Sequence, residues 1–255
     1  MASKRADTSW GKVATWYDEH LKTCDDTYQK QLILPNILRV LDLHEGENVL
    51  DLACGQGFFA RAFNKTGARV TGCDISKELI AIAQAQSDEK ITYVTAQADQ
   101  LSFSKSSSFD TVVCILALQN IENILSTYKE VSRVLVFGGR FVIVINHPAF
   151  RVPKNSSWGW DDEKNVQFRR VDRYLSADSV PIHVHPGLQD PVATISYHRS
   201  LQDFFKVSAK VGFAVTRLEE WISHKKSTLG PRQKAEDTAR KEIPLFLMLE
   251  ARKEK

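Results

Sequence analysis

The chain has 255 residues, 43% of them hydrophobic and 25% charged, and a formal net charge of +3 at pH 7. This length and composition predict a globular protein with one sizeable core, and so small a charge does not by itself indicate nucleic-acid binding. The cysteines are scattered without a Cys-x-x-Cys pair, which argues against a zinc ribbon or a disulfide framework, and we expect no metal site.

The first part of the chain, residues 1–43, has helical character, and its start lacks the apolar core of a signal peptide. No apolar stretch in the sequence is long enough to span a bilayer. We therefore expect a cytoplasmic protein with reduced thiols and no membrane segment.

Short runs rich in Val and Ile then alternate with segments of helical spacing. The predicted strands cover residues 48–52, 69–74, 91–96, 110–116 and 140–146. Between them we expect helices at about 58–65, after Ser76, and at about 123–136, the last ending at Gly138-Gly139. Such alternation is typical of a parallel sheet wound by helices.

The pattern changes after residue 146. Residues 147–197 are rich in proline and lack a long amphipathic helix, so we expect an insertion that caps the carboxyl edge of the sheet. Ser200 predicts the start of a helix that Gly212 ends, and strands follow at about 213–220 and 245–252, with a charged, exposed helix and loop between them. We expect a single domain over residues 1–255.

An acid and two glycines follow the first predicted strand in the run VLDLACGQGFFA. Asp51, the turn at Gly55 and Gly57, and Asp74 at the end of the second strand place two carboxylates and a bare backbone loop around one nucleoside-sized crevice. An ionised carboxylate at Asp74 offers two acceptor oxygens at the spacing of a vicinal diol, as in a ribose.

Three successive motifs, VLDLACGQG, VTGCDIS and FDTVVCILALQNIEN with FGGRFVIVIN behind it, resemble those of class I S-adenosylmethionine-dependent methyltransferases. The resemblance covers most of the chain, from Trp16 to the final strand. It implies an α/β fold with a doubly wound, seven-stranded and mostly parallel sheet in the order 3-2-1-4-5-7-6, the last strand antiparallel and helices on both faces. It also implies S-adenosyl-L-methionine as the cofactor and methyl transfer as the activity.

The same resemblance implies a set of cofactor-binding residues. Asp51 would bind the ammonium group of the cofactor, Asp74 the ribose hydroxyls and Asp99 the adenine amino group. Ile75 and Leu116 would supply apolar faces to the ring. The whole expected set is Tyr17, Asp51, Ala53, Gly55, Gly57, Asp74, Ile75, Asp99, Gln100 and Leu116.

The methyl acceptor is expected at the carboxyl edge of the sheet, beside the predicted cap. His147, directly after the fifth strand, is the candidate general base, and Trp158, Arg170 and Tyr197 are candidate substrate contacts. Weaker candidates for the base are His183, His185, Tyr197 and His198. The segment LALQN lacks the Asn/Asp-Pro-Pro-aromatic motif of many nucleobase and glutamine methyltransferases, which favours a small-molecule acceptor methylated at O, N or C.

Three other functions stay open at this point. The insertion could bind RNA, as in a tRNA-modifying methyltransferase, although its acidic residues interrupt any basic stripe. A protein that binds S-adenosylmethionine without catalysis would keep the same carboxylates. The loop from Gly55 to Ala60 also satisfies a loose dinucleotide pattern of NAD(P)-dependent oxidoreductases, against which Asp51 and Asp99 argue.

Overall fold

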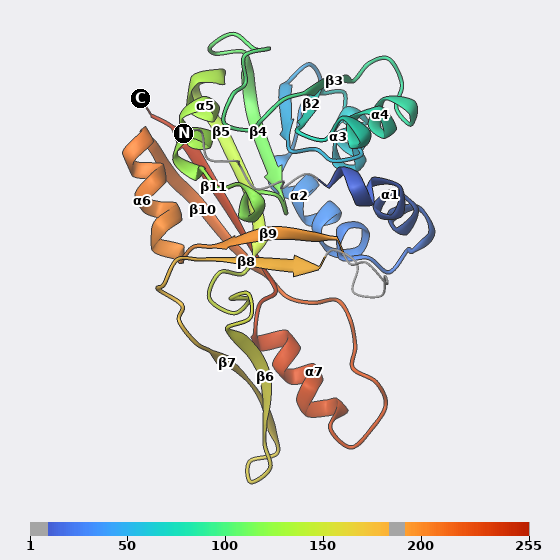
Figure 1. The fold of residues 1–255 in the computed structure, drawn as a ribbon, viewed down its shortest axis with the longest axis vertical. Helices are drawn as coiled ribbons and strands as arrows, with labels where there is room; N and C mark the ends of the chain where they lie inside the picture. Colours follow the sequence, from blue (N-terminus) through green and yellow to red (C-terminus); the bar gives the residue numbers. More distant parts are fainter. Residues whose placement is uncertain (1–9, 184–191, 255) are drawn as a thin grey trace.

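The computed structural model describes residues 10–183 and 192–254, with a seven-stranded sheet at its centre (Figure 1). Its strands are β1 (Asn48–Leu52), β2 (Arg69–Asp74), β3 (Thr92–Thr95), β4 (Phe109–Ile115), β5 (Leu135–Asn146), β10 (Phe213–Trp221) and β11 (Phe246–Lys253). Their order is β10-β11-β5-β4-β1-β2-β3, and β11 runs antiparallel to both of its neighbours, whereas the remaining pairs are parallel. The predicted fold and strand order are confirmed.

Helices cover both faces of the sheet (Figure 1). The α-helices of the described residues are α1 (Ala14–Thr23), α2 (Leu34–Leu41), α3 (Phe58–Asn64), α4 (Lys77–Ala85), α5 (Ile124–Val134), α6 (Leu201–Val211) and α7 (Gln233–Glu242). Helices α2, α3 and α4 pack in one hydrophobic cluster, and α5 and α6 pack in a second. Val49 of β1 joins the first cluster and Leu50 the second, because successive strand residues point to opposite faces. Within the described ranges, no helix combines the length and apolarity needed to cross a bilayer.

The predicted helix ends are confirmed at α4 and α6. The Ser76 hydroxyl oxygen accepts a backbone N–H from the first turn of α4 at 3.2 Å. Ser200 and Asp203 form a capping box at the start of α6, and Gly212 ends that helix in the left-handed conformation. Ser76 is the N-cap of α4 and lies two residues after Asp74. The cap therefore also fixes the loop at the end of β2.

The junction of α5 and β5 differs from the prediction. The helix ends at Val134, and β5 begins at Leu135 rather than near residue 140. Leu135 pairs with Phe109 of β4, and pairing resumes at Arg140, so residues 136–139 bulge out of the ladder. Gly138 has a φ of 74° in this bulge. The two glycines therefore serve an irregularity in the strand and do not end the helix.

The insertion after β5 folds into two hairpins. One pairs β6 (Ser156–Asp161) with β7 (Val166–Val171), and the other pairs β8 (Asp178–His183) with β9 (Ala193–His198). The β8–β9 hairpin lies across the end of the sheet, where Asn120 Nδ2 donates to the carbonyl oxygen of Ile195 at 2.8 Å (Figure 1). The expected cap over the sheet edge thus corresponds to this second hairpin.

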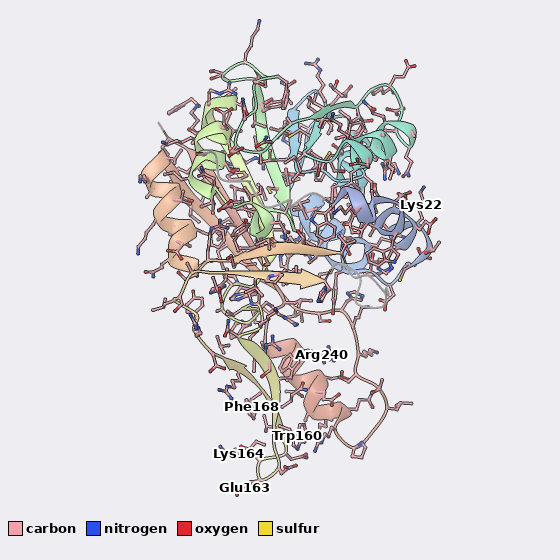
Figure 2. All side chains as sticks on the ribbon, viewed as in Figure 1. Lys22, Trp160, Glu163, Lys164, Phe168 and Arg240 are labelled. Atoms are coloured by element: carbon pink, nitrogen blue, oxygen red, sulfur yellow. The ribbon has the colours of Figure 1, made fainter. Side chains whose placement is uncertain are left out.

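The β6–β7 hairpin extends away from the sheet and packs against α7 (Figure 1). The guanidinium carbon of Arg232, at the start of α7, lies 4.4 Å from the ring centre of Trp160. Figure 2 shows Trp160, Lys164 and Phe168 at the far end of this hairpin. The hairpin and α7 therefore form a unit that projects beyond the carboxyl edge of the sheet (Figure 1).

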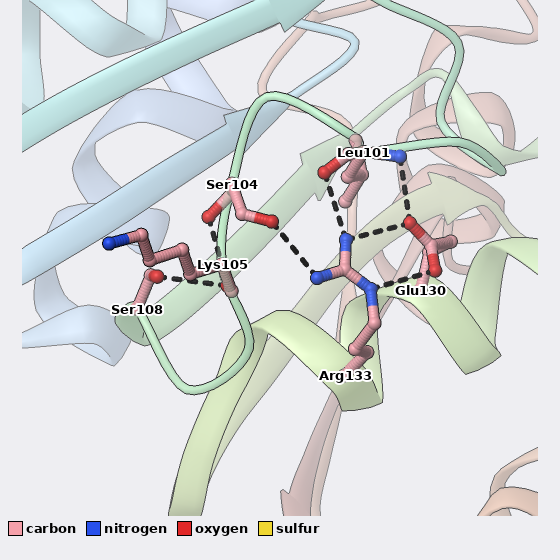
Figure 3. Close-up of polar contacts among 6 residues, drawn as sticks. All are labelled: Leu101, Ser104, Lys105, Ser108, Glu130 and Arg133. Atoms are coloured by element: carbon pink, nitrogen blue, oxygen red, sulfur yellow. Dashed lines mark hydrogen bonds and ion pairs between the residues drawn. The ribbon is translucent and has the colours of Figure 1, made fainter.

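An arginine of α5 holds the loop that follows β3 (Figure 3). Arg133 donates to the carbonyl oxygens of Leu101 at 2.8 Å and Ser104 at 2.9 Å. Glu130 accepts from Arg133 at 2.9 Å and from the backbone N–H of Leu101 at 2.8 Å. These charge-assisted bonds fix the start of residues 101–108, directly after the segment that carries Asp99.

Candidate active site

A cavity of about 300 Å³ lies at the carboxyl ends of β1, β2, β4 and β5. The N-terminal helix α1 contributes Tyr17 and Leu21 to its wall, and β8 contributes Ile182. The position between β1 and β4 is the topological switch point of the sheet, where ligands bind in open α/β folds. The volume is at the lower end of the range for small-molecule sites.

The two glycines of the first loop have different tasks. Gly55 lines the cavity with a φ of 57°, and a side chain built there would meet no heavy atom within 4 Å. Its backbone therefore faces open space, as close approach of a ligand requires. Gly57, with a φ of 80°, begins α3, and a side chain there would collide with the hydroxyl of Tyr93. Gly57 is thus required by packing and does not line the cavity.

Asp51 is the most unusual group in the cavity wall. Its side chain is 2% exposed, and its Oδ2 atom has no hydrogen-bond partner. Burial, and then the negative charge of Asp74, raise the pKa of Asp51 to about 7. An unpaired buried carboxyl is costly, and a cationic group in the cavity would satisfy it.

Asp74 lies in the same wall and is held by the loops around it. Its Oδ2 accepts from the backbone N–H of Gly55 at 2.9 Å, and its Oδ1 accepts from that of Ser76 at 2.9 Å. Burial raises the pKa of Asp74, and these two donors oppose that rise. Each carboxylate oxygen keeps acceptor capacity for a further hydrogen bond from the cavity.

The remaining cavity residues of the expected cofactor set are Tyr17, Ala53, Ile75 and Leu116. Ala53 and Leu116 adopt positive φ angles of 59° and 54°, which turn the chain sharply at the ends of β1 and β4. Ile75 is 47% exposed although it is apolar, because it borders the cavity. Burial raises the pKa of Tyr17, and an interaction with the side chain of Gln29 opposes that rise.

Asp99 and Gln100 lie in a tight turn after β3, outside the cavity lining. The backbone N–H of Gln100 donates to the carbonyl oxygen of Gln97 at 3.0 Å, and Asp99 is half-buried. The turn is at the same edge of the sheet, since the backbone N–H of Ala96 donates to the carbonyl oxygen of Asp74. Their assignment to the adenine ring stays a prediction.

His147 lies in a setting that does not suit a general base. Its Nδ1 accepts backbone N–H groups of Ala149 at 3.2 Å and Phe150 at 3.4 Å, so the proton is on Nε2, which donates to Glu220 at 2.7 Å. Burial lowers the pKa of His147. Both ring nitrogens are thus engaged, and the imidazole does not line the cavity. The histidine caps the turn after β5, and the role predicted for it is unsupported.

The structure separates the three predicted substrate contacts. Trp158 and Arg170 lie on the β6–β7 hairpin, where Trp158 stacks with Arg169 and Arg170 pairs with Asp172 at 2.8 Å. Neither lines the cavity. Tyr197, on β9, lines a smaller neighbouring cavity.

The weaker histidine candidates also lie elsewhere. His183 is exposed at the end of β8, and His198 Nε2 bonds the carbonyl oxygen of Tyr174 at 2.8 Å. His185 lies outside the described residues. Within the part of the chain that the structure describes, no group of His, Cys, Asp and Glu is placed to hold a metal ion.

Several residues of the cavity were not predicted, among them three amides at the carboxyl ends of β4 and β5 and the aromatic ring of Trp10. Gln119 and Asn120 belong to the short helix η3 (Leu118–Asn120), Asn146 ends β5, and Trp10 precedes α1. The Oε1 atom of Gln119 is buried without a hydrogen-bond partner. Its position after the fourth strand was the available signal, since carboxyl ends of the central strands face the ligand.

Comparisons with known proteins match methyltransferases. Residues 50–143 match the family model described as a methyltransferase domain. The demethylmenaquinone methyltransferase of Tropheryma whipplei (strain Twist) is 36% identical over 113 residues, 43% of this chain and 46% of that protein. The ubiquinone biosynthesis O-methyltransferase of Vibrio parahaemolyticus is 31% identical over 111 residues, 42% of this chain and 47% of that protein. The chain spans about half the length of the curated relatives it matches.

Solved structures resemble a larger part of the chain. An S-adenosylmethionine-dependent methyltransferase from Mesorhizobium loti matches with a TM-score of 0.66 and 28% identity, over 86% of this chain and 96% of that one. A structure described as a putative S-adenosylmethionine-dependent methyltransferase, from Listeria monocytogenes, matches with a TM-score of 0.68 and 23% identity, over 86% of this chain and 97% of that one.

Proposed function

We propose that the chain transfers a methyl group from S-adenosyl-L-methionine to a small-molecule acceptor, on the premise that residues 50–143 match a methyltransferase domain. S-Adenosyl-L-methionine is the methyl donor of the family, and it supplies an electrophilic methyl group on a sulfonium. The observation that carries the proposal is the unpaired, buried Oδ2 atom of Asp51 beside Asp74 in the cavity wall.

The cavity residues fit the donor by chemistry. The carboxylate of Asp51 would pair with the donor's ammonium group, and the free acceptor sites of Asp74 would bind the ribose hydroxyls. The open space at Gly55 would admit the donor close to the backbone. Ile75 and Leu116 would flank the adenine ring of the donor. Tyr17 of α1 would cover the amino-acid end of the donor.

Catalysis would rest on positioning. None of the described residues that line the cavity is a histidine, and the groups at the ends of β4 and β5 are the amides of Gln119, Asn120 and Asn146. Such amides bind and orient but do not take up a proton. The unpaired Oε1 of Gln119 would accept a hydrogen bond from an O–H or N–H group of the acceptor and align its nucleophile for in-line attack.

Two observations support a small molecule as the acceptor. Helix α1 and Ile182 of the β8–β9 hairpin form part of the cavity wall, and a volume of about 300 Å³ suits a small molecule better than a nucleobase held on a polymer. The two sequence relatives named above carry names from quinone biosynthesis, a small-molecule chemistry.

The buried, unpaired thiols of Cys54, Cys73 and Cys114 support a reducing, cytoplasmic compartment.

The proposal is tested by donor turnover. Purified protein is incubated with S-adenosylmethionine and with either the small-molecule fraction or the RNA fraction of a cell extract, and S-adenosylhomocysteine is quantified. The proposal predicts product with the small-molecule fraction only, and loss of that product in Asp51→Asn. Product formed with RNA alone would favour an RNA-modifying enzyme, and binding without turnover in either fraction would favour a non-catalytic S-adenosylmethionine-binding protein.

A further inference from the structure

A second, smaller cavity adjoins the donor cavity. Gln119 and Asn146 line both, so these two amides stand between them. The second cavity has a volume of about 30 Å³, which is room for roughly two water-sized groups. Its other walls come from the turn after β5 and from the end of β9, two segments that sequence reasoning had linked to the acceptor.

Arg199, directly after β9, lines this cavity and carries an unsatisfied donor. Its Nη2 donates to the carbonyl oxygens of Ile121 at 2.8 Å and Glu122 at 2.6 Å, and its guanidinium stacks over the ring of Tyr197 at 5.5 Å. These contacts fix the plane of the guanidinium. Its Nη1, however, is buried without a hydrogen-bond partner. Burying a charged donor without a partner costs more folding free energy than burying a neutral one, and an anion would supply the missing acceptor.

Arg151 brings a second positive charge from the turn after β5. Its backbone N–H donates to the carbonyl oxygen of His147 at 2.8 Å, which fixes the residue at the cavity wall. Among the described residues, its half-buried guanidinium has no hydrogen-bond or ion-pair partner. Burial, and then the like charge of Arg169, lower its pKa. Two arginines therefore line one small cavity, whose described walls hold no Asp or Glu.

We propose that Arg151 and Arg199 bind a carboxylate of the methyl acceptor, so that the acceptor is a small organic acid whose reacting end lies in the donor cavity. The inference rests on the proposed function and narrows its substrate class. The planar guanidinium groups match the two oxygens of a carboxylate, and the cavity has room for about two such atoms. Gln119 and Asn146, which line both cavities, would contact the acceptor between its carboxylate and its reacting end.

The test uses benzoate as the probe acid and benzamide as its neutral isostere. The protein is first saturated with S-adenosylhomocysteine, and each probe is then titrated by calorimetry. We expect benzoate to bind at least tenfold more tightly than benzamide. Arg151→Gln should lower the benzoate affinity at least tenfold. It should leave the S-adenosylhomocysteine affinity unchanged, because Arg151 does not line the donor cavity.

Arg170→Gln is the matched control, since it removes the same charge from an exposed position of the β6–β7 hairpin that does not line the cavity. It should bind benzoate as the wild type does. Equal affinities for benzoate and benzamide, no detectable benzoate binding, or an unchanged affinity in Arg151→Gln would each overturn the carboxylate subsite. A wild-type protein that fails to bind S-adenosylhomocysteine would instead refute the proposed function, so the two failures are distinguishable.

Discussion

Asp51 joins two properties that usually exclude each other, since it is buried and it has an oxygen without a partner. We predict that Asp51→Asn weakens S-adenosylhomocysteine binding roughly 10- to 150-fold, the range for loss of a charge-assisted hydrogen bond of about 1.5–3 kcal/mol. Calorimetric titration measures this. An affinity within twofold of the wild type would show that the ammonium group binds elsewhere.

The raised pKa of Asp51 gives its stability contribution a definite sign. With a pKa of about 7 in the folded state, the Asp51 carboxyl keeps its proton between about pH 4 and pH 7, whereas in the unfolded chain it has lost it. The contribution of Asp51 to the unfolding free energy is therefore present at low pH and is lost as the pH rises towards 7. The unfolding free energy of Asp51→Asn relative to the wild type should therefore increase between pH 5 and pH 8. The slope is at most about 1.4 kcal/mol per pH unit. A pH-independent difference in denaturant titrations would contradict the assignment.

Donor binding should show the opposite trend with pH. The ammonium group requires the ionised carboxylate, so affinity is full above about pH 7 and falls below it, by up to about tenfold per pH unit. Calorimetry at pH 6 and pH 8 measures the change. In Asp51→Asn this pH dependence should largely disappear, and its persistence there would assign it to another group.

The location of a site residue was predictable from the sequence where that residue lies at the end of a predicted strand. Asp51, Gly55 and Asp74 were assigned to the crevice because their positions follow from the strand pattern, and the structure brings them together in one cavity. The setting of His147 was not predictable, because its neighbours are set by tertiary packing. Its partner Glu220 lies on β10, seventy-three residues away in the chain, and no local pattern predicts that pairing.

At the scale of elements, the loop after β3 depends on one arginine of α5. Arg133→Met removes the bonds to Leu101 and Ser104 and leaves Glu130 without its cationic partner. We predict a loss of unfolding free energy of about 1–3 kcal/mol, measured by denaturant titration. The exposed Arg170→Met, as the control, should change it by no more than about 0.5 kcal/mol. Equal effects in the two variants would show that the network does not stabilise the fold.

The two hairpins of the insertion should differ in their effect on the site. Trp158, on the β6–β7 hairpin, packs with Arg169 and does not line the cavity, so Trp158→Ala should keep the S-adenosylhomocysteine affinity within twofold. Trp10 lines the cavity, and Trp10→Ala should lower that affinity at least fivefold. A large loss in Trp158→Ala alone would mean that the projecting unit reaches the donor site.

Helices and strands whose ends are marked by nearby residues in the sequence were predicted closely. Those whose ends depend on pairing with a distant strand were not. Strands 48–52 and 69–74 have the predicted bounds, and α6 has its predicted caps. The start of β5 was misplaced because the glycines of residues 136–139 suit a helix end and a strand bulge equally well. Only the register against β4 decides between them. Likewise, the sequence of residues 147–197 predicts an insertion, but packing against α7 and η3 decides where each hairpin lies.

For the whole molecule, donor binding should stabilise the folded state by mass action. At a ligand concentration of 100 times Kd the gain is about 2.7 kcal/mol, which for a domain of this size corresponds to a rise in Tm of roughly 5–11 °C. S-Adenosylhomocysteine should produce this rise in a thermal melt, and NADH should not. A rise in Tm with NADH alone would favour the alternative of an NAD(P)-dependent oxidoreductase.

The central claim is that the cavity between β1 and β4 binds the methyl donor through its two carboxylates. Calorimetric titration with S-adenosylhomocysteine tests it most directly, using wild type, Asp74→Asn and the exposed control Asp172→Asn. The account predicts saturable binding in the wild type and in Asp172→Asn, and a loss of at least tenfold in Asp74→Asn. Absence of binding in the wild type, or equal affinities in all three proteins, would contradict it.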